Sequence, residues 1–370
     1  MSAFDPAVAD VRLRIRERSL PLRAPLGTAT GEIRERPVFL VALAGTFAGG
    51  ESCRGVGEAA PLPPWTEPVG DCRLALEGAA DAVAAGAAVD LGGLPPAARH
   101  ALSLASVDAR ARRDGVPLSR ALAAAGDPPA ASVPANATVG DGSVAETVAA
   151  ADTAVAEGFD CLKCKVGARS VAEDTERLRA VRESVGDDVV IRADANGAWD
   201  REAAARAVEA FAAPDVDLAY LEQPVARDDH ESLRALRGRG VPVAVDETVN
   251  APDGTDGWPD PIGEYADVAV LKPMAQGGPE ATVAAARDLH DRGVDTVVTT
   301  TIDAAVARTA AVHVAAAVPG GGERAHGLAT GDLLAADVVD GDDDPVPVAD
   351  GRVAVPTGPG LAGDLFDGVV

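Results

Sequence analysis

From residue 136 to about residue 330, short apolar runs alternate with Ala-rich stretches whose spacing is typical of helices. Apolar residues fill most positions of each run, which favours strands buried on both faces of a parallel sheet. The predicted strands are NATV (136–139), CLKCKV (161–166), VVIRADA (189–195), LAYLEQ (218–223), VPVAVDE (241–247), DVAVLKP (267–273), DTVVTTT (295–301) and a weaker AHGLAT (325–330). Eight such units are the number that closes a barrel, so we predict an α/β barrel rather than an open doubly wound sheet.

The N-terminal third of the chain has a different pattern. Residues that favour strands occupy Val11–Leu20 and Pro37–Ala44, and turn residues separate the two stretches. Residues 72–125 have the Ala- and Leu-rich composition of helices, interrupted at Gly92–Pro96 and Gly115–Pro117. We therefore expect strands followed by helices, which is an α+β arrangement.

Pro and small residues cluster in Gly126–Pro134, and this segment is the predicted boundary between the two parts. We place an α+β domain at residues 1–130 and the barrel at residues 131–337. The tail from about residue 338 to residue 370 is rich in turn residues and has a short strand pattern at Arg352–Val355. We expect this tail to fold back and complete the N-terminal part.

The net charge is −25, from 58 acidic and 33 basic residues, and an acidic loop is expected at Gly254–Tyr265. A surface this acidic repels nucleic acid and anionic membranes, so we exclude both as partners. It also indicates adaptation to a salt-rich cytoplasm, where ions screen the repulsion between like charges. The sequence has no signal-peptide pattern and no apolar run long enough to span a membrane, and we expect a cytoplasmic protein.

Polar residues stand at the ends of five consecutive predicted strands, one β/α unit apart. They are Lys163 and Lys165, Asp194 and Asn196, Glu222, Asp246 and Glu247, and Lys272. In a parallel barrel the C-terminal ends of the strands meet at one rim, where such folds carry their active sites. We therefore expect all eight side chains to converge there.

Asp194, Glu222 and Asp246 would bring three carboxylates together on neighbouring strands. Unpaired acids placed so closely would repel one another, whereas Mg²⁺ prefers an octahedron of oxygen ligands. The three acids are therefore the predicted ligands of Mg²⁺, with Mn²⁺ as an alternative ion.

Lys163 and Lys165 lie two residues apart on one strand, so their side chains point to the same side. Lys272 enters the barrel mouth from across the ring. A lysine crowded by other cations is pushed toward its neutral form and can act as a base. The alternative, simple ion pairing of the lysines with the acids, is compatible with catalysis.

Other candidate sites have structural interpretations. Cys161-x-x-Cys164 lies within one strand, with no second pair nearby, and we interpret both cysteines as packing residues. Among the five histidines only His326 stands at a strand end near the predicted mouth, and we interpret each as structural or exposed. Motifs for a serine nucleophile, a P-loop and a dinucleotide site are absent from the sequence.

Five motifs resemble the muconate-lactonizing-enzyme subgroup of the enolase superfamily, in order and at its spacing. They are LKCKVG (162–167), RADANGAW (192–199), LEQPV (221–225), AVDET (244–248) and LKPMAQGG (271–278). The resemblance runs from GVGEAAPLPP (55–64) to GLATGDLLAADV (327–338). It implies a modified (β/α)₇β barrel with an α+β capping domain, in which the stretch around Leu22–Glu35 is a loop that closes over the substrate.

The resemblance also implies roles for the strand-end residues. In such enzymes a lysine removes a proton α to a carboxylate, and Mg²⁺ holds the resulting enediolate. Carried over by position, Asp194, Glu222 and Asp246 match the metal ligands, and Asn196 and Glu247 match residues that support them. Lys163 and Lys165 match the Lys-x-Lys pair, and Lys272 matches the lysine on the opposite face.

The text HGLATGDLL is similar to the o-succinylbenzoate synthases of menaquinone biosynthesis. In these dehydratases one lysine takes the proton and returns it to the departing hydroxyl; that role falls on Lys165. Dipeptide epimerases carry an Asp-x-Asp where this chain has Gly327 and Ala329. Thr300, Thr301, Gly327 and Arg192 match substrate-contacting positions, whereas Asp303 departs from the common Glu.

Three functions therefore stay open. The first is Mg²⁺-dependent dehydration that makes o-succinylbenzoate, and the second is racemisation or epimerisation of N-acyl amino acids or dipeptides. The third is a non-catalytic barrel that binds a carboxylate ligand, which would need no set of lysines on two faces. The expected partner is a small-molecule carboxylate substrate, and self-association into a homo-oligomer is common among such barrels.

Overall fold

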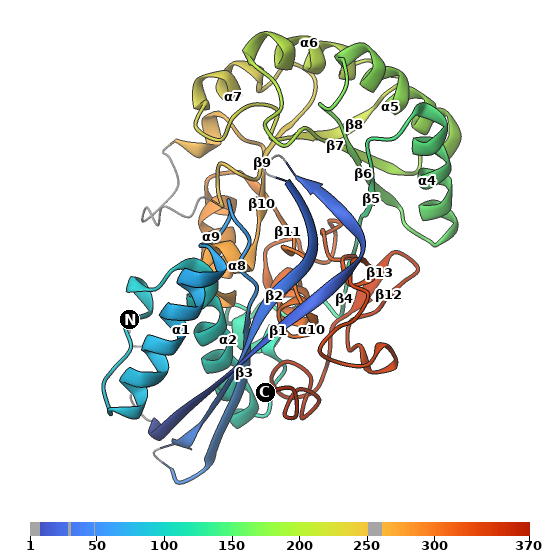
Figure 1. Cartoon of the computed structure of the whole chain (residues 1–370). Coiled ribbons are helices and arrows are strands. Elements are labelled where there is room, and N and C mark those ends of the chain that lie inside the picture. The colour runs from blue at the N-terminus through green and yellow to red at the C-terminus, as the bar shows by residue number, and fades with distance from the viewer. Residues whose placement is uncertain (1–7, 29–30, 48, 251–260) are drawn as a thin grey trace.

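The computed structural model describes residues 8–28, 31–47, 49–250 and 261–370, and its central feature is a curled parallel sheet (Figure 1). Seven strands are ordered β11-β10-β9-β8-β7-β6-β5, so every strand neighbours the next one along the chain. Their bounds are β5 (Ala137–Val139), β6 (Cys161–Lys165), β7 (Val190–Asp194), β8 (Leu218–Glu222), β9 (Val243–Val245), β10 (Val268–Leu271) and β11 (Asp295–Val298). Each lies within a predicted run, so the parallel sheet is confirmed.

The eighth run closes the barrel by single parallel bridges on both of its sides. His326 bridges to Ala135, just before β5, and Gly327 bridges to Thr299, just after β11. The Gly327 amide donates to Val298 at 2.9 Å, and the Asn136 amide donates to His326 at 2.9 Å. A Cβ at Gly327 would lie 2.2 Å from the Thr299 hydroxyl, so only glycine permits this closure.

Helices cover the outside of the sheet, as the alternating pattern predicts (Figure 1). They are α4 (Val144–Ala156), α5 (Val171–Val185), α6 (Arg201–Phe211), α7 (His230–Leu236), α8 (Pro273–Gln276), α9 (Pro279–Asp291) and α10 (Ala305–Ala317). Ser143 with Glu146 and Ser170 with Glu173 form capping boxes, which fix where α4 and α5 begin. All but the last residue of the Ala- and Val-rich α10 are buried.

The N-terminal part is an antiparallel sheet of β1 (Val8–Thr28), β2 (Gly31–Phe47) and β3 (Ser52–Ala59), covered by helices. The helical elements are α1 (Val69–Ala84), η1 (Leu91–Gly93), α2 (Pro96–Arg113) and α3 (Leu118–Leu122). Gly55 and Gly57 let α2 lie directly on β3, because a Cβ on either would come within 1.9 Å of a carbonyl oxygen of α2. The predicted order of strands and then helices is confirmed.

The stretch Leu22–Glu35 was expected to be a loop, but most of it continues β1 and β2 as a long hairpin. The strand register shifts between Pro21 and Leu26, where the loop was expected. Leu22 forms an antiparallel bridge with Leu334, and the Ala335 amide donates to the Pro21 carbonyl at 2.8 Å. These contacts attach the hairpin to the segment that follows the eighth run. Residues 29–30 lie outside the described part.

The tail returns to both parts of the molecule. β12 (Val348–Ala349) and β13 (Arg352–Ala354) form a small sheet with β4 (Ser132–Pro134). Further on, the Leu361 amide donates to the buried Asp108 carboxylate of α2 at 2.8 Å, and Phe366 is fully buried. The strand at Arg352–Val355 and the return of the tail are therefore observed, while the division into domains stays a prediction.

One apolar cluster runs through the N-terminal part and the barrel, joining Leu40 of β2 and Leu104 of α2 to Leu162 of β6. Cys161 and Cys164 are buried and unlinked, in agreement with a packing role. Within the described ranges, no helix has the length and apolar character that a membrane span needs. The remaining short helices are η2 (Ile262–Glu264), η3 (Gly331–Leu333) and η4 (Gly341–Asp343). The expected acidic loop at Gly254–Tyr265 lies largely outside the described residues.

His326 has a structural role at the barrel seam, and it generates a prediction about acid stability. Its Nδ1 accepts the Val298 amide at 3.0 Å and its Nε2 faces the Gly321 carbonyl at 2.9 Å. Burial lowers the pKa of His326 to about 4 from its ordinary 6.5. Between these two pH values His326 binds a proton in the unfolded chain but not in the folded chain. The free energy of unfolding therefore falls as pH drops from about 6.5 to about 4.

We expect His326→Gln to reduce this pH dependence by about 1 kcal/mol per pH unit in that window, because a glutamine can accept and donate without titrating. Urea unfolding between pH 4.5 and 7.5 measures the effect. The exposed His290→Gln is the matched control. Parallel curves for His326→Gln and the wild type would contradict the assignment.

Candidate active site

The strand register brings the predicted site residues to one level at the barrel rim. Lys165 of β6 is paired with Asp194 of β7, and Asp194 is paired with Glu222 of β8. Glu222 is in turn opposite Ala244 of β9, two residues before Asp246. Convergence of side chains from five strands is thus a direct result of parallel pairing, and the expected gathering of lysines and acids is observed.

Each of the three central acids is paired with a lysine. The Lys163 Nζ donates to Glu222 Oε1 at 2.7 Å and lies 2.9 Å from Asp194 Oδ2. The Lys165 Nζ lies 2.6 Å from the same Asp194 oxygen. Lys272 forms an ion pair with Asp246 from the other side of the ring. The simple ion pairing considered from the sequence is therefore present.

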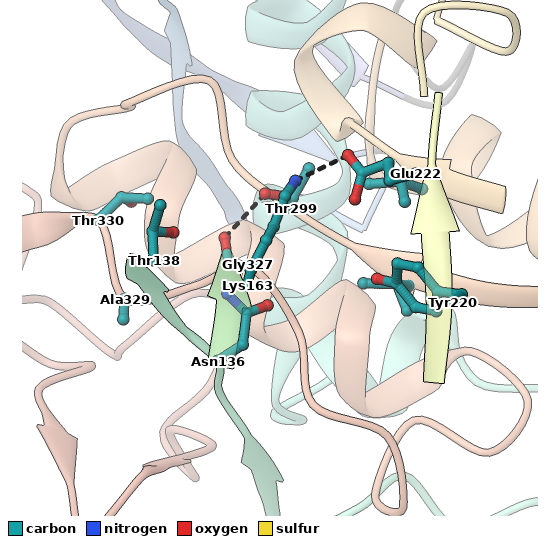
Figure 2. Close-up of a pocket in the computed structure, with 11 residues that line it drawn as sticks. Asn136, Thr138, Lys163, Tyr220, Glu222, Thr299, Gly327, Ala329 and Thr330 are labelled. Atoms are coloured by element: carbon teal, nitrogen blue, oxygen red, sulfur yellow. Dashed lines mark hydrogen bonds and ion pairs between the residues drawn. The ribbon is translucent and has the colours of Figure 1, made fainter. Parts of the chain in front are cut away.

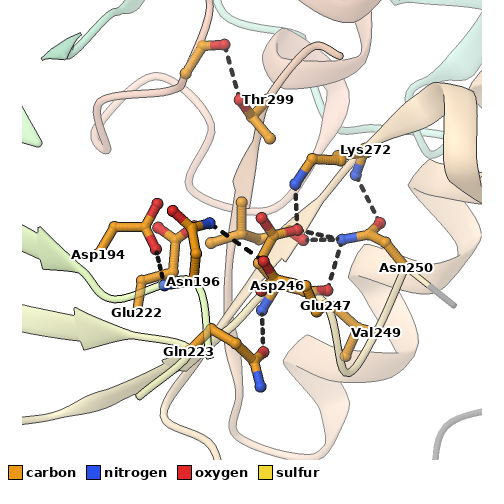
Figure 3. A network of polar contacts seen from close by, with 12 residues as sticks. Asp194, Asn196, Glu222, Gln223, Asp246, Glu247, Val249, Asn250, Lys272 and Thr299 are labelled. Carbon is orange, nitrogen blue, oxygen red and sulfur yellow. Dashed lines mark hydrogen bonds and ion pairs between the residues drawn. The ribbon is translucent and has the colours of Figure 1, made fainter. Parts of the chain in front are cut away.

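Asn196 and Glu247 lie beside these acids, as their positions predict. The Lys165 Nζ donates to Asn196 Oδ1 at 2.7 Å. Figure 3 shows the next contact of the network, in which Asn196 Nδ2 donates to Glu247 Oε1 at 3.2 Å. Asn196 has a φ of +45°, a conformation that asparagine tolerates better than most residues. The backbone amide of Asn196 donates to Asp194 Oδ1 at 3.0 Å, which orients the Asp194 carboxylate.

Burial and repulsion between the acids raise their pKa values, whereas the neighbouring lysines lower them. Burial, and then the charge of Asp194, raise the pKa of Glu222 to about 7. Burial opposes ionisation of Asp194 as well, but Lys163 and Lys165 hold its pKa below the ordinary value. Burial alone would lower the pKa of Lys163, whereas the surrounding acids raise it well above normal. In this arrangement Lys163 is an ammonium ion.

The donor set also fits a divalent cation chemically. Glu222 Oε2 and Glu247 Oε2 are buried and have no hydrogen-bond partner among the residues that the structure describes. Orphaned buried oxygens are rare, and carboxylate oxygens are the ligands that hard cations take. In the part of the chain that the structure describes, however, no three Asp, Glu, His or Cys side chains are arranged to hold a metal ion. Instead, the lysine ammonium groups are bonded to some of the carboxylate oxygens.

Two amides that the sequence reasoning missed hold Asp246 in place (Figure 3). Asn250 Nδ2 donates to Asp246 Oδ1 at 2.8 Å, and Asn250 Oδ1 accepts the Lys272 amide at 2.9 Å. Gln223 Oε1 accepts the Asp246 amide at 3.0 Å. The sequence did contain one signal for Gln223, because its amide side chain directly follows the predicted ligand Glu222.

Trp65 of the N-terminal part was also missed. The Lys272 Nζ lies 4.8 Å from the centre of a Trp65 ring, which is a cation–π distance. The Trp65 indole N–H is buried, and no described residue accepts a hydrogen bond from it. A tryptophan far away in sequence thus covers a site lysine, and no local pattern marks it.

A cavity of about 50 Å³ lies beside Lys163 and Glu222 (Figure 2). This is room for water and is smaller than a typical small-molecule site. Besides these two residues it is lined by Asn136, Thr138, Tyr220, Val270, Val297, Thr299, Gly327, Ala329 and Thr330. Gly327 is where the substrate contact was predicted.

Thr300, Thr301 and Arg192 are not among the residues that line this cavity. The Thr300 hydroxyl meets Thr330 at 2.7 Å, and the Thr301 hydroxyl donates to Asp303 at 2.5 Å. Arg192 lies over Tyr220, 4.9 Å from the ring centre, and donates to the Ala325 carbonyl at 2.7 Å. Thr299 lines the cavity and Thr300 does not, because adjacent residues of an extended segment point to opposite sides.

Comparisons with known proteins agree with this geometry. A family model described as "Enolase C-terminal domain-like" matches residues 146–366, which is more than half of the chain. An o-succinylbenzoate synthase from Mycobacterium leprae is 39% identical over 228 residues, which are 59% of this chain and 63% of the relative. A second, from Thermobifida fusca, is 37% identical over 215 residues, 56% of this chain and again 63% of the relative. The aligned part thus spans less than two thirds of these curated relatives.

Solved structures share the whole fold. The L-Ala-D/L-Glu epimerase from Bacillus subtilis has a TM-score of 0.79 at 25% identity, over 95% of this chain and 97% of that one. A dipeptide epimerase from Methylococcus capsulatus, complexed with Mg and the dipeptide L-Arg-D-Lys, has a TM-score of 0.79 at 28% identity, over 96% and 99%. The barrel, the capping sheet and the resemblance inferred from the motifs are thereby confirmed. The chain belongs to the enolase C-terminal domain-like family, within the enolase superfamily.

Proposed function

We propose that this protein is a Mg²⁺-dependent dehydratase that makes o-succinylbenzoate for menaquinone biosynthesis. The observation that carries the proposal is the placement of lysines on two sides of one group of buried acids. The curated relatives named o-succinylbenzoate synthase, at 37–39% identity, support the choice of reaction. A barrel that only binds a carboxylate would need one of these lysines rather than three.

Asp194, Glu222 and Asp246 would hold the cation, with Mn²⁺ as an alternative to Mg²⁺. A bound divalent cation supplies positive charge that stabilises the negative charge developing on the substrate carboxylate. Glu222 and Glu247 each offer an oxygen without a partner in the described part of the chain, and the similar dipeptide epimerase from Methylococcus capsulatus is complexed with Mg. Asn196, Gln223 and Asn250 would keep the acids oriented by the hydrogen bonds described above.

Lys165 is the proposed base. Its side chain is 34% exposed, against 16% for Lys163 and 7% for Lys272, so it is the lysine most open to a substrate. It would take the proton α to the carboxylate and return it to the hydroxyl that leaves as water. Lys163 would assist, and Lys272, fixed by Asp246 and Trp65, would stabilise negative charge from the opposite face.

Epimerisation of dipeptides or N-acyl amino acids is the second candidate, because epimerases share the fold over nearly the whole chain. Lysines on two faces suit proton removal on one side and return on the other. Gly327 and Ala329, which line the cavity, offer no carboxylate to a substrate ammonium group. This favours N-acylated substrates over free dipeptides within this alternative.

A direct assay tests the reaction. We expect the purified protein, in molar KCl with Mg²⁺, to convert the hydroxylated succinyl-cyclohexadiene carboxylate to o-succinylbenzoate and water, followed by ultraviolet absorbance. N-succinyl amino acids and dipeptides are assayed in parallel for a change in optical rotation. Turnover of these compounds alone would replace the first candidate with the second.

Lys165→Met should lower kcat by about 1,000-fold, because it removes the proposed base while keeping the length of the side chain. Single-turnover kinetics and Mg²⁺ titration measure chemistry and metal binding separately, and Mg²⁺ affinity should be retained. A variant with wild-type kcat would remove Lys165 from the mechanism.

Glu222→Gln should weaken Mg²⁺ binding by about 100-fold, since one anionic ligand is lost. Isothermal titration of metal-free protein measures this without any substrate. Glu280→Gln is the matched control, because Glu280 is exposed and pairs with Arg110 on the outside of the barrel. Equal affinity in both variants would contradict the proposed ligand set.

A further inference from the structure

Arg36 of β2 is a buried arginine that links two segments bordering the site. It is only 2% exposed. Its Nη2 and Nη1 donate to the carbonyls of Ala60 and Pro61 at 2.8 and 3.0 Å. Its Nε donates to the carbonyl of Ile302 at 3.2 Å. One guanidinium group thus satisfies three carbonyls from parts of the chain more than 200 residues apart.

The first segment leads to Trp65. Ala60 and Pro61 follow β3 directly, and Trp65 lies a few residues further on, over the Lys272 ammonium group. The Ala60 amide also contacts the Met274 sulfur at 3.3 Å, two residues beyond Lys272. The position of this segment therefore decides whether the indole reaches Lys272.

The second segment leads from the cavity to α10. Thr299 lines the cavity, and Ile302 follows three residues later with a φ of +61°. A β-branched residue in this left-handed conformation is strained and persists only where its surroundings hold it. The Ile302 side chain packs in an apolar cluster with Met274 and Ala60, while Arg36 fixes its carbonyl.

Two buried acids complete the arrangement around Arg36. Glu58 of β3 accepts the amides of Ala304 and Ala307, both at 2.8 Å, at the start of α10. Asp303 accepts the Thr301 hydroxyl. A guanidinium carries donors in a planar fork that can reach several acceptors at once, whereas a lysine ammonium would supply charge without that fork.

We propose that Arg36 is a positioning residue that holds the Ala60–Trp65 and Thr299–Asp303 segments together and thereby sets substrate affinity. The effect on affinity rests on the proposed function, whereas the link between the two segments does not. Asp303, which departs from the family pattern, belongs to the second segment and helps to fix it through Thr301.

Arg36→Lys tests the proposed link between the two segments. The variant keeps the positive charge beside Glu58 and Asp303 but lacks the planar set of donors that bonds three carbonyls at once. We expect amide hydrogen exchange in residues 60–66 and 299–304 to become about tenfold faster, since one or two hydrogen bonds are lost. Exchange in β7 and β8 should not change. KM should rise about tenfold, and kcat should fall much less, because Asp246 still holds Lys272. Arg73→Lys is the control, because Arg73 makes a two-pronged contact with Glu17 at the surface.

Wild-type exchange in both segments of Arg36→Lys would overturn the proposal, and so would a uniform increase across the barrel. If the wild type does not turn over the diene carboxylate, the proposed function fails while the exchange result still decides the role of Arg36. Should Arg36→Lys not fold, native-state exchange of the wild type in low denaturant replaces it. The two segments should then open with one common free energy, and independent openings would refute the link.

Discussion

The interaction on which the site depends is the pairing of buried opposite charges at the barrel rim. Parallel strands in register bring their ends to one level, and here those ends carry both acids and ammonium groups. Burial of either kind alone would be strongly unfavourable. Lys163, shared between Asp194 and Glu222, makes the arrangement tolerable, and the hydrogen bonds from Asn196, Gln223 and Asn250 keep the charges from rearranging.

This pairing has a chemical consequence. An ammonium ion bound to carboxylates is a poor base, because it already holds the proton that a base must accept. The proposed divalent cation would compete with the lysines for the same oxygens and favour their neutral form. On this proposal, one set of carboxylates would both pair with the lysines and hold the metal.

Much of the fold was predictable because barrel strands are buried on both faces and give unbroken apolar runs. The rim residues were predictable from their spacing of one β/α unit, because parallel strands in register bring their ends to the same level. The Leu22–Glu35 hairpin was missed because strand pairing extends through turn-like residues once Leu334 and Ala335 support them. Thr299 lines the cavity near which Thr300 and Thr301 were expected, because a run of three threonines does not reveal which side chain points inward. Arg36, Trp65 and Asn250 act through contacts distant in sequence, which no local pattern records.

The return of the tail to α2 affects how the chain acquires its structure during synthesis. Asp108, buried in α2, receives the Leu361 amide, and Phe366 is fully buried near the end of the chain. The first helices therefore finish packing only after residues 361–366 have left the ribosome. Until then the nascent N-terminal part exposes apolar surface that these residues later cover.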